Sequence, residues 1–127
     1  ISKKVEFNIS AKPFNLRARI NKPLFAWVIE NLCKNAVDSM GGIGKIDIHI
    51  KKSLDDKVIV DLIDTGKGIP KSKIKDVFAP GYTTKKRGWG LGLTLVKRII
   101  ENYHQGKIIV LSSEIDKGTT FRIFLKA

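Results

Sequence analysis

The stretch IENLCKNAVDSM, residues 29–40, carries two asparagines within the pattern of an amphipathic helix. Asn21 supplies an N-cap for this helix, and the glycines at 41 and 42 end it. Asn31 and Asn35 are one turn apart and therefore lie on the same side of the helix. Asparagine is a poor helix former, costing about 0.5 kcal/mol relative to alanine, so the pair indicates a site on this side.

The apolar residues of the helix recur at helical spacing and predict one broad buried face. They are Phe25, Val28, Ile29, Leu32, Cys33, Ala36, Val37 and Met40. Asn31, Asn35 and Asp38 lie together on the edge of that face, neither in the core nor on the far solvent side. A polar group that borders the core in this way is typical of a pocket wall.

Alternation of apolar and polar residues predicts strands before and after this helix. We expect strands over 5–9, 14–20, 45–53, 57–64, 106–113 and 119–125, and a second helix over 91–103. Residues 65–90 are rich in glycine and proline and predict a loop, apart from a short turn near 71–77. Strands and helices in this mixed order predict an α+β two-layer sandwich, in which helices pack on one face of a mixed, mostly antiparallel sheet.

The composition is that of a single globular domain. The chain has 127 residues, no run of 18 or more apolar residues and no apolar signal-peptide segment at its N-terminus. Its single cysteine excludes an intramolecular disulfide and is consistent with a reducing cytoplasm. The two histidines and the cysteine are too widely spaced to form a zinc-ligand pattern. We therefore expect residues 1–127 to form one domain located in the cytoplasm.

The net charge of +12 is concentrated in one segment of the chain. Residues 67–87 hold seven lysines and arginines and one acid, Asp76. An anionic partner is the natural inference, and it could be a nucleic acid, a membrane surface or the phosphates of a small molecule. Charge alone does not choose among them.

Two glycine-rich motifs flank this basic segment. In Asp64-x-Gly66-x-Gly68, a carboxylate at a strand end can accept a hydrogen bond from a ligand amine while the glycines turn the chain back over it. Gly88, Gly90 and Gly92 precede the second helix, and their open backbone N–H groups suit phosphate oxygens. Each motif taken alone is also compatible with a plain loop.

The order of the motifs along the chain is more specific than any one of them. In order they are Asn31-x-x-x-Asn35-Ala36, Asp64-x-Gly66-x-Gly68, Phe78, Thr83-Thr84-Lys85, Gly88-x-Gly90-Leu91-Gly92-Leu93 and Gly118-Thr119-Thr120-Phe121. From about residue 5 to residue 126, this sequence resembles the ATP-binding domain of sensor histidine kinases, which has the Bergerat-type (GHKL) nucleotide fold.

The resemblance implies a role for each motif. Asn35 would be a Mg²⁺ ligand through its amide oxygen, and Asn31 would contact the phosphates. Asp64 would accept from the adenine amino group, with Thr119 completing a water-bridged contact. Phe78 would anchor the start of a mobile lid. The implied ATP-binding set is Asn31, Asn35, Asp38, Asp64, Gly66, Gly68, Ile69, Phe78, Thr83, Thr84, Lys85, Arg87, Gly88, Gly90, Leu91, Gly92, Leu93 and Thr119.

Asn35 and Lys85 are the implied catalytic residues, with Lys86 and Arg87 as further candidates to meet the γ-phosphate. One departure concerns Asp38-Ser39, which stands where many sensor kinases have Lys-Tyr or Arg-Tyr and is nearer to the ATPase branches of the fold.

A kinase and an ATPase of this fold differ at one position. The ATPase branches place a general-base glutamate one turn before the metal-binding asparagine, and here that position is Asn31; Glu30 points away. Neither His49 nor His104 lies in the helical context of a phosphoacceptor. The resemblance therefore implies transfer to a histidine on a separate dimerisation domain, with a response regulator downstream, and a monomeric isolated domain that does not autophosphorylate alone.

Other functions remain as alternatives. A GHKL-type ATPase and an anti-sigma-type serine kinase share this fold, although the segment from Phe78 to Lys85 is more like that of a sensor kinase. A basic nucleic-acid-binding module would interleave aromatic residues with the lysines, whereas the basic segment has only Phe78 and Tyr82. A non-catalytic nucleotide sensor would be expected to lack binding motifs, and none is missing.

Overall fold

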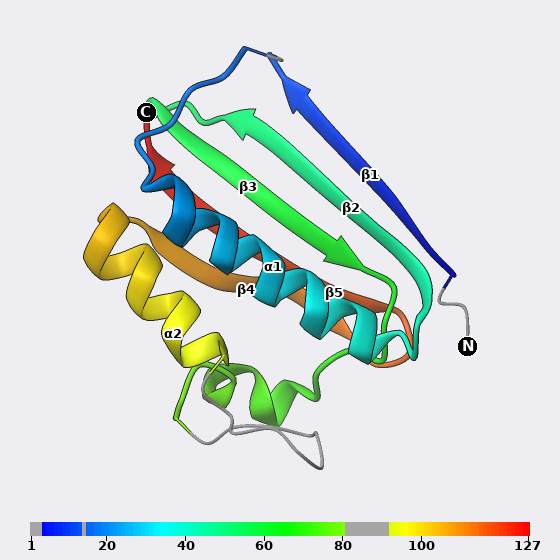
Figure 1. The fold of residues 1–127 in the computed structure, drawn as a ribbon. Helices are drawn as coiled ribbons and strands as arrows, with labels where there is room; N and C mark the ends of the chain where they lie inside the picture. The colour runs from blue at the N-terminus through cyan, green and yellow to red at the C-terminus, as the bar shows by residue number, and fades with distance from the viewer. Residues whose placement is uncertain (1–3, 14, 81–91) are drawn as a thin grey trace.

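The computed structural model describes residues 4–13, 15–80 and 92–127, which form a five-stranded sheet with helices on one face (Figure 1). In chain order the elements are β1 (Lys4–Lys12), α1 (Lys22–Ser39), β2 (Ile43–Lys52), β3 (Lys57–Asp64), the 3₁₀ turn η1 (Lys71–Asp76), α2 (Gly92–Arg98), the π turn η2 (Ile99–Tyr103), β4 (Lys107–Glu114) and β5 (Gly118–Lys126). None of the described helices has the length and apolar character needed to cross a membrane.

The strands are arranged in the order β1-β2-β3-β5-β4. β1 pairs with β2 in parallel, and the other neighbouring strands pair antiparallel. Both α1 and α2 lie on the same face of this sheet (Figure 1). The predicted α+β sandwich with a mixed, mostly antiparallel sheet is therefore confirmed.

The hydrophobic core lies between the two helices and the sheet. Its buried members are Val28, Leu32 and Ala36 of α1, Val96 and Ile100 of the second helix, and Ile46, Ile48, Val58, Val60, Leu62, Ile108, Phe121, Ile123 and Leu125 of the strands. Burial of each large aliphatic side chain contributes about 1.5–3 kcal/mol. The apolar face predicted for residues 25–40 is thus the face that packs on the sheet.

The ends of α1 follow the local signals in the sequence. The Asn21 side chain accepts a hydrogen bond from the Leu24 N–H at 3.1 Å, which confirms its N-cap role. At the other end, Gly41 has a φ of +64°, the left-handed conformation that favours glycine after a helix.

The strand predicted over residues 14–20 is wrong. Residues 15–20 form a turn and an extended connection with no ladder pairing. They pass across the end of the sheet, where Arg19 N–H donates one hydrogen bond to the Lys126 carbonyl. Alternation matches burial at Leu16 and Ala18, which are half-buried, but not at Ile20, which is exposed. This contact is made at Lys126, the last residue of β5, so the segment and the strand do not run side by side.

The second helix is longer than one regular α-helix. α2 covers 92–98 and continues as η2 to residue 103, so the predicted range of 91–103 is confirmed apart from Leu91, which lies outside the described residues. His104 follows it and is buried, accepting from Asn21 N–H through Nε2 at 3.0 Å while Nδ1 faces the Ile99 carbonyl at 3.0 Å. It joins the two helices, as expected of a structural histidine.

The two ends of the sheet hold different segments of the chain. Asp64 at the end of β3 and Gly118 at the start of β5 share one end with the last turn of α1, and we call this the site end. The opposite end, the far end, holds the β2–β3 turn, the end of β5 and the start of α1 (Figure 1).

Candidate functional site

The carboxylate of Asp64 is the centre of the candidate site. It ends the central strand β3, and the residue is only 6% exposed. Its Oδ1 accepts hydrogen bonds from Gly66 N–H at 2.8 Å and Thr119 N–H at 3.2 Å. Burial raises the pKa of the Asp64 carboxyl above its ordinary value, because loss of water disfavours the charged form, and the two hydrogen bonds offset part of this rise.

The second oxygen of Asp64 is available to a ligand. Both hydrogen bonds from described residues end on Oδ1. Oδ2 therefore has no hydrogen-bond partner in this part of the chain. Every fully buried side-chain oxygen or nitrogen of the described residues does have one, so Oδ2 is in contact with solvent. The protein thus fixes the carboxylate through one oxygen and leaves the other to accept a hydrogen bond from a donor outside the chain.

The glycines around Asp64 are required by close packing. A Cβ at Gly118, which has a φ of +131°, would overlap the carbonyl oxygen of Asp64. Gly68 has a φ of +77°, and a Cβ there would overlap the carbonyl of Glu114. The loop after β3 is therefore pressed against the β4–β5 hairpin, and a side chain at either position would displace the carboxylate.

The end of α1 holds the other side of the same loop. Ser39 accepts from Lys67 N–H twice, through Oγ at 3.0 Å and through its carbonyl at 3.2 Å. A Cβ at Gly66 would overlap the Ser39 hydroxyl. A small residue at position 39 therefore lies directly against the Asp64-x-Gly66 turn.

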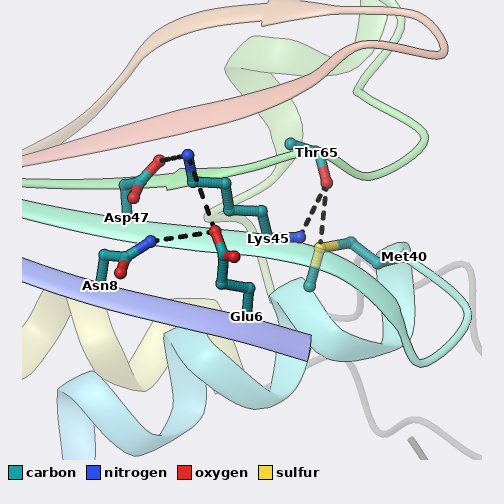
Figure 2. A network of polar contacts seen from close by, with 6 residues as sticks. All are labelled: Glu6, Asn8, Met40, Lys45, Asp47 and Thr65. Carbon is teal, nitrogen blue, oxygen red and sulfur yellow. Dashed lines mark hydrogen bonds and ion pairs between the residues drawn. The ribbon is translucent and has the colours of Figure 1, made fainter. Parts of the chain in front are cut away.

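Thr65 connects the loop to β2. Its Oγ1 accepts from Lys45 N–H at 3.0 Å and lies 3.5 Å from the Met40 sulfur (Figure 2). The threonine beside Asp64 is therefore held by the connection between α1 and β2.

Figure 2 also shows the exposed ion pairs at this end of the sheet. Lys45 Nζ lies 3.6 Å from Asp47 Oδ2 and 3.9 Å from Glu6 Oε2, and Asn8 donates to the same Glu6 oxygen at 3.2 Å. Exposed pairs of this kind contribute about 0–1 kcal/mol, so they orient side chains and add little stability.

Ser113 of β4 holds the loop of residues 64–69 against the β4–β5 hairpin. Its hydroxyl accepts from Ile69 N–H at 2.8 Å and lies 2.8 Å from the Thr119 hydroxyl. Asp116 N–H donates to the Lys67 carbonyl at 2.9 Å. The loop of residues 64–69 is therefore clamped between α1 and the β4–β5 hairpin.

The polar edge of α1 faces the start of α2. Asn31 and Asn35 are half-buried and Asp38 is exposed. Asn31 Nδ2 donates to the Trp27 carbonyl at 3.0 Å, and a Cβ at Gly92 would lie 3.5 Å from Asn31 Oδ1. The predicted edge position of these side chains is confirmed, and their Gly92 neighbour comes from the second glycine motif.

Phe78 is fixed just before the segment that carries the predicted lid. Its ring packs edge-to-face on Phe121, with centroids 6.2 Å apart, and Lys97 Nζ lies 5.7 Å from the ring centroid. Thr94 Oγ1 donates to the Phe78 carbonyl at 2.9 Å. The residue thus joins α2 to the sheet.

The candidate residues divide into two groups. Those that lie within the described residues are Asn31, Asn35, Asp38, Asp64, Gly66, Gly68, Ile69, Phe78, Gly92, Leu93 and Thr119. Those that lie outside the described residues are Thr83, Thr84, Lys85, Arg87, Gly88, Gly90 and Leu91. Their assignments stay predictions.

Sequence reasoning missed Ser39 and Ser113 as site-forming residues. Ser39 was visible only as a small residue in place of an aromatic one. Ser113 carried a weaker signal, since Ser112 and Ser113 interrupt an otherwise apolar strand.

The family model for histidine kinase-, DNA gyrase B- and HSP90-like ATPases matches residues 21–127. Sensor histidine kinase ZraS of Salmonella typhimurium is 37% identical over 124 residues, which are 98% of this chain and 26% of ZraS. Sporulation kinase E of Bacillus subtilis is 46% identical over 98 residues, which are 77% of this chain and 13% of that kinase. The chain thus spans about a quarter or less of these relatives.

Solved structures agree with these relatives. The catalytic domain of histidine kinase ThkA matches with a TM-score of 0.83 and 31% identity, over 96% of this chain and 78% of that one. ThkA in complex with the response regulator protein TrrA matches with a TM-score of 0.79 and 30% identity, over 95% of this chain and 34% of that one. The chain therefore belongs to the family of histidine kinase-, DNA gyrase B- and HSP90-like ATPases, as an ATP-binding domain of the sensor histidine kinase type.

Proposed function

We propose that this domain binds Mg-ATP at the site end and donates the γ-phosphoryl group to a histidine on a separate dimerisation domain. The observation that carries the proposal is the Asp64 carboxylate, buried and fixed through Oδ1 with Oδ2 left to accept. An adenine amino group is a donor of the right kind for that oxygen. Gly66 and Gly68 let the loop pack closely against Ser39 and Glu114 beside it.

The phosphates would lie along the polar edge of α1. The Asn31 amide lies there beside Gly92, and Asn35 is half-buried one turn further along the same edge. The described residues contain no group of three or more His, Cys, Asp or Glu side chains placed to hold a metal ion. Mg²⁺ usually keeps several waters and binds few protein ligands together with substrate phosphates, so one amide oxygen, from Asn35, fits the donor set. When bound, the ion would neutralise phosphate charge.

Transfer to a protein fits this site better than hydrolysis. An attacking water needs a base near the γ-phosphate, and the side chain at the corresponding position is Asn31. Its Nδ2 donates to the Trp27 carbonyl, and an amide does not accept a proton at neutral pH. The Asn31 amide would instead orient phosphate oxygens, which is the main task in phosphoryl transfer.

The acceptor histidine would come from another part of the parent kinase. Both ring nitrogens of His104 face partners in the fold, Asn21 N–H and the Ile99 carbonyl. His49 lies in β2, opposite Asp61 of β3, and away from the site end. We therefore expect the histidine on a dimerisation domain and a response regulator as the next partner, with all of these in the cytoplasm, where ATP is available.

Mg-ATP binding can be measured by titration with the fluorescence of Trp27 and Trp89 as the signal and calorimetry as a second method. We expect saturable binding that weakens with EDTA. Asn35→Ala should weaken Mg-ATP binding about tenfold or more, and the difference from the wild type should disappear in EDTA if the residue acts through the metal. Asn8→Ala, on exposed β1, is the matched control and should bind like the wild type. Absence of binding by both methods would refute the proposal.

Phosphoryl transfer requires a second measurement, with γ-labelled ATP and the histidine-bearing segment of the parent kinase added in trans. Acid-labile label should appear on that segment and not on the domain. Release of inorganic phosphate at the same rate without the acceptor would instead favour an ATPase.

A further inference from the structure

A cavity of about 410 Å³ lies at the far end of the sheet, away from the candidate nucleotide site. It is lined by Ser53, Asp55, Lys57, Gln105, Gly106, Lys107, Phe124, Leu125 and Lys126. We call it the corner cavity. Lys57 begins β3 and Asp64 ends it, so the two sites are separated by about 23 Å at 3.3 Å per residue. The two sites therefore share no residue.

Three lysines from three different strands converge on the corner cavity. Lys57 of β3 is the direct cross-strand partner of Lys126 of β5, and Lys107 of β4 pairs with Phe124 of β5. Each of the three lysines is next to a core residue along its strand, and successive side chains of a strand point to opposite faces. The lysines therefore project from the face of the sheet that carries no helix. Like charges directly opposite each other in an antiparallel pair are destabilising. The fold therefore places positive charges together here at a cost.

Acidic residues compensate only part of this charge. Asp55 Oδ2 lies 3.6 Å from Lys57 Nζ. Among the described residues, neither Lys107 nor Lys126 forms an ion pair. Two ammonium groups at the rim of one cavity are therefore left for an anion from outside the chain.

The cavity also has an apolar wall and a fixed shape. Phe124 is half-buried and Leu125 is buried. A Cβ at Gly106 would overlap the Phe124 carbonyl, so the α2–β4 connection is pressed onto β5 there. Gly106 N–H donates to the Ile100 carbonyl at 2.9 Å and closes the end of the second helix. The packing of the α2–β4 connection on β5 thus positions one side of the cavity.

We propose that the corner cavity binds a small phosphate-bearing molecule, whose phosphate lies between Lys107 and Lys126 and whose remainder contacts Phe124. The volume falls in the range of small-ligand sites. Lysine binds phosphate as a point charge without the planar fork that arginine uses for carboxylates, and the cavity lining contains no arginine. The excess of lysines favours a ligand with two or more negative charges.

The test is an NMR titration of the ¹⁵N-labelled domain with pyrophosphate and, separately, with citrate, both without Mg²⁺. Saturable shifts are expected at the amides of Ser53, Gln105, Gly106 and Lys107 for pyrophosphate. The same spectra report the nucleotide site through Gly66, Gly68 and Thr119. Shifts confined to those three amides, or shifts that never saturate, would overturn the proposal. Equal affinity for citrate would overturn the assignment to phosphate.

Two double variants separate this site from general electrostatics. Lys107→Ala with Lys126→Ala should raise the dissociation constant about tenfold or more. Lys4→Ala with Lys12→Ala changes the net charge equally, on exposed β1 at the other edge of the sheet, and should change the constant less than about twofold. Equal losses in both variants would show non-specific attraction and refute the proposal. Lys107→Gln alone, which keeps the aliphatic stem, should also weaken binding.

Discussion

At the scale of single residues, burial of the Asp64 carboxyl suits ligand binding but lowers the free energy of unfolding at neutral pH. Its raised pKa means that the folded protein holds the proton more tightly than the unfolded chain does. The stabilisation from the protonated form is complete below the ordinary pKa of an aspartate and is lost as the pH rises through the raised value. At neutral pH the ionised carboxylate therefore lowers the free energy of unfolding.

Asp64→Asn should separate these two effects. Asn Oδ1 can still accept from Gly66 and Thr119 N–H, so we expect the variant to be at least as stable as the wild type at pH 7 by urea denaturation. Relative to the variant, the wild type should gain stability as the pH falls through the raised pKa. Nucleotide affinity should fall about tenfold or more, because the free position becomes an NH₂ donor facing the adenine amine.

Two results would contradict this account. If the asparagine variant bound ATP like the wild type, the carboxylate would not contact adenine. If its stability relative to the wild type did not change with pH, the burial of Asp64 would not control its ionisation.

At the scale of elements, the sequence predicted the features that depend on residues adjacent in the chain. Asn21 as N-cap and the glycines after Met40 bounded α1 because capping depends on adjacent residues. Residues 15–20 alternate like a strand but form a connection, because only the rest of the sheet determines whether an edge is available. The parallel pairing of β1 with β2 has no local signal either.

The candidate site divides in the same way. Asp64 and Gly66 form a motif that suits a ligand amine but also suits a plain loop, and only the resemblance to sensor histidine kinases implies their role and that of Thr119. Ser39 and Ser113 act through contacts between elements that are far apart in the chain, at 28 and 44 residues from Lys67 and Ile69. Such contacts become visible only once the elements are packed.

Ser113 provides a test of how the hairpin supports the loop. Ser113→Ala removes the acceptor of Ile69 N–H and the contact with Thr119 Oγ1, so we expect a loss of about 1–3 kcal/mol in the free energy of unfolding. Ser112→Ala, at the exposed neighbouring position, is the matched control and should stay within about 0.5 kcal/mol of the wild type. Nucleotide binding should weaken in the first variant alone. Equal stability of the two variants would show that the hairpin does not hold the loop.

At the scale of the whole molecule, β3 and β5 bring together segments that are far apart in the chain. They are direct neighbours in the sheet although residues 65–117 separate them. On the face without helices, Arg122 of β5 makes two hydrogen bonds to Asp61 of β3, at 2.7 and 2.8 Å. The two side chains are 20% and 10% exposed, whereas every other ion pair given for the described residues has at least one side chain that is 48% exposed or more. We expect this bidentate pair to help hold the register that sets Asp64 beside Thr119.

The pair should therefore matter more than the surface ion pairs, and a double-mutant cycle can measure it. Arg122→Ala leaves the largely buried Asp61 carboxylate without its partner, so we expect a loss of about 2–4 kcal/mol in the free energy of unfolding. Asp61→Ala with Arg122→Ala removes both charges and should cost less than the sum of the single variants. Lys52→Ala, which breaks an exposed pair with Asp56 at 2.9 Å, should cost less than about 1 kcal/mol. Additive single variants would mean that the two side chains do not act together, and the register would then depend on the core residues of β3 and β5 alone.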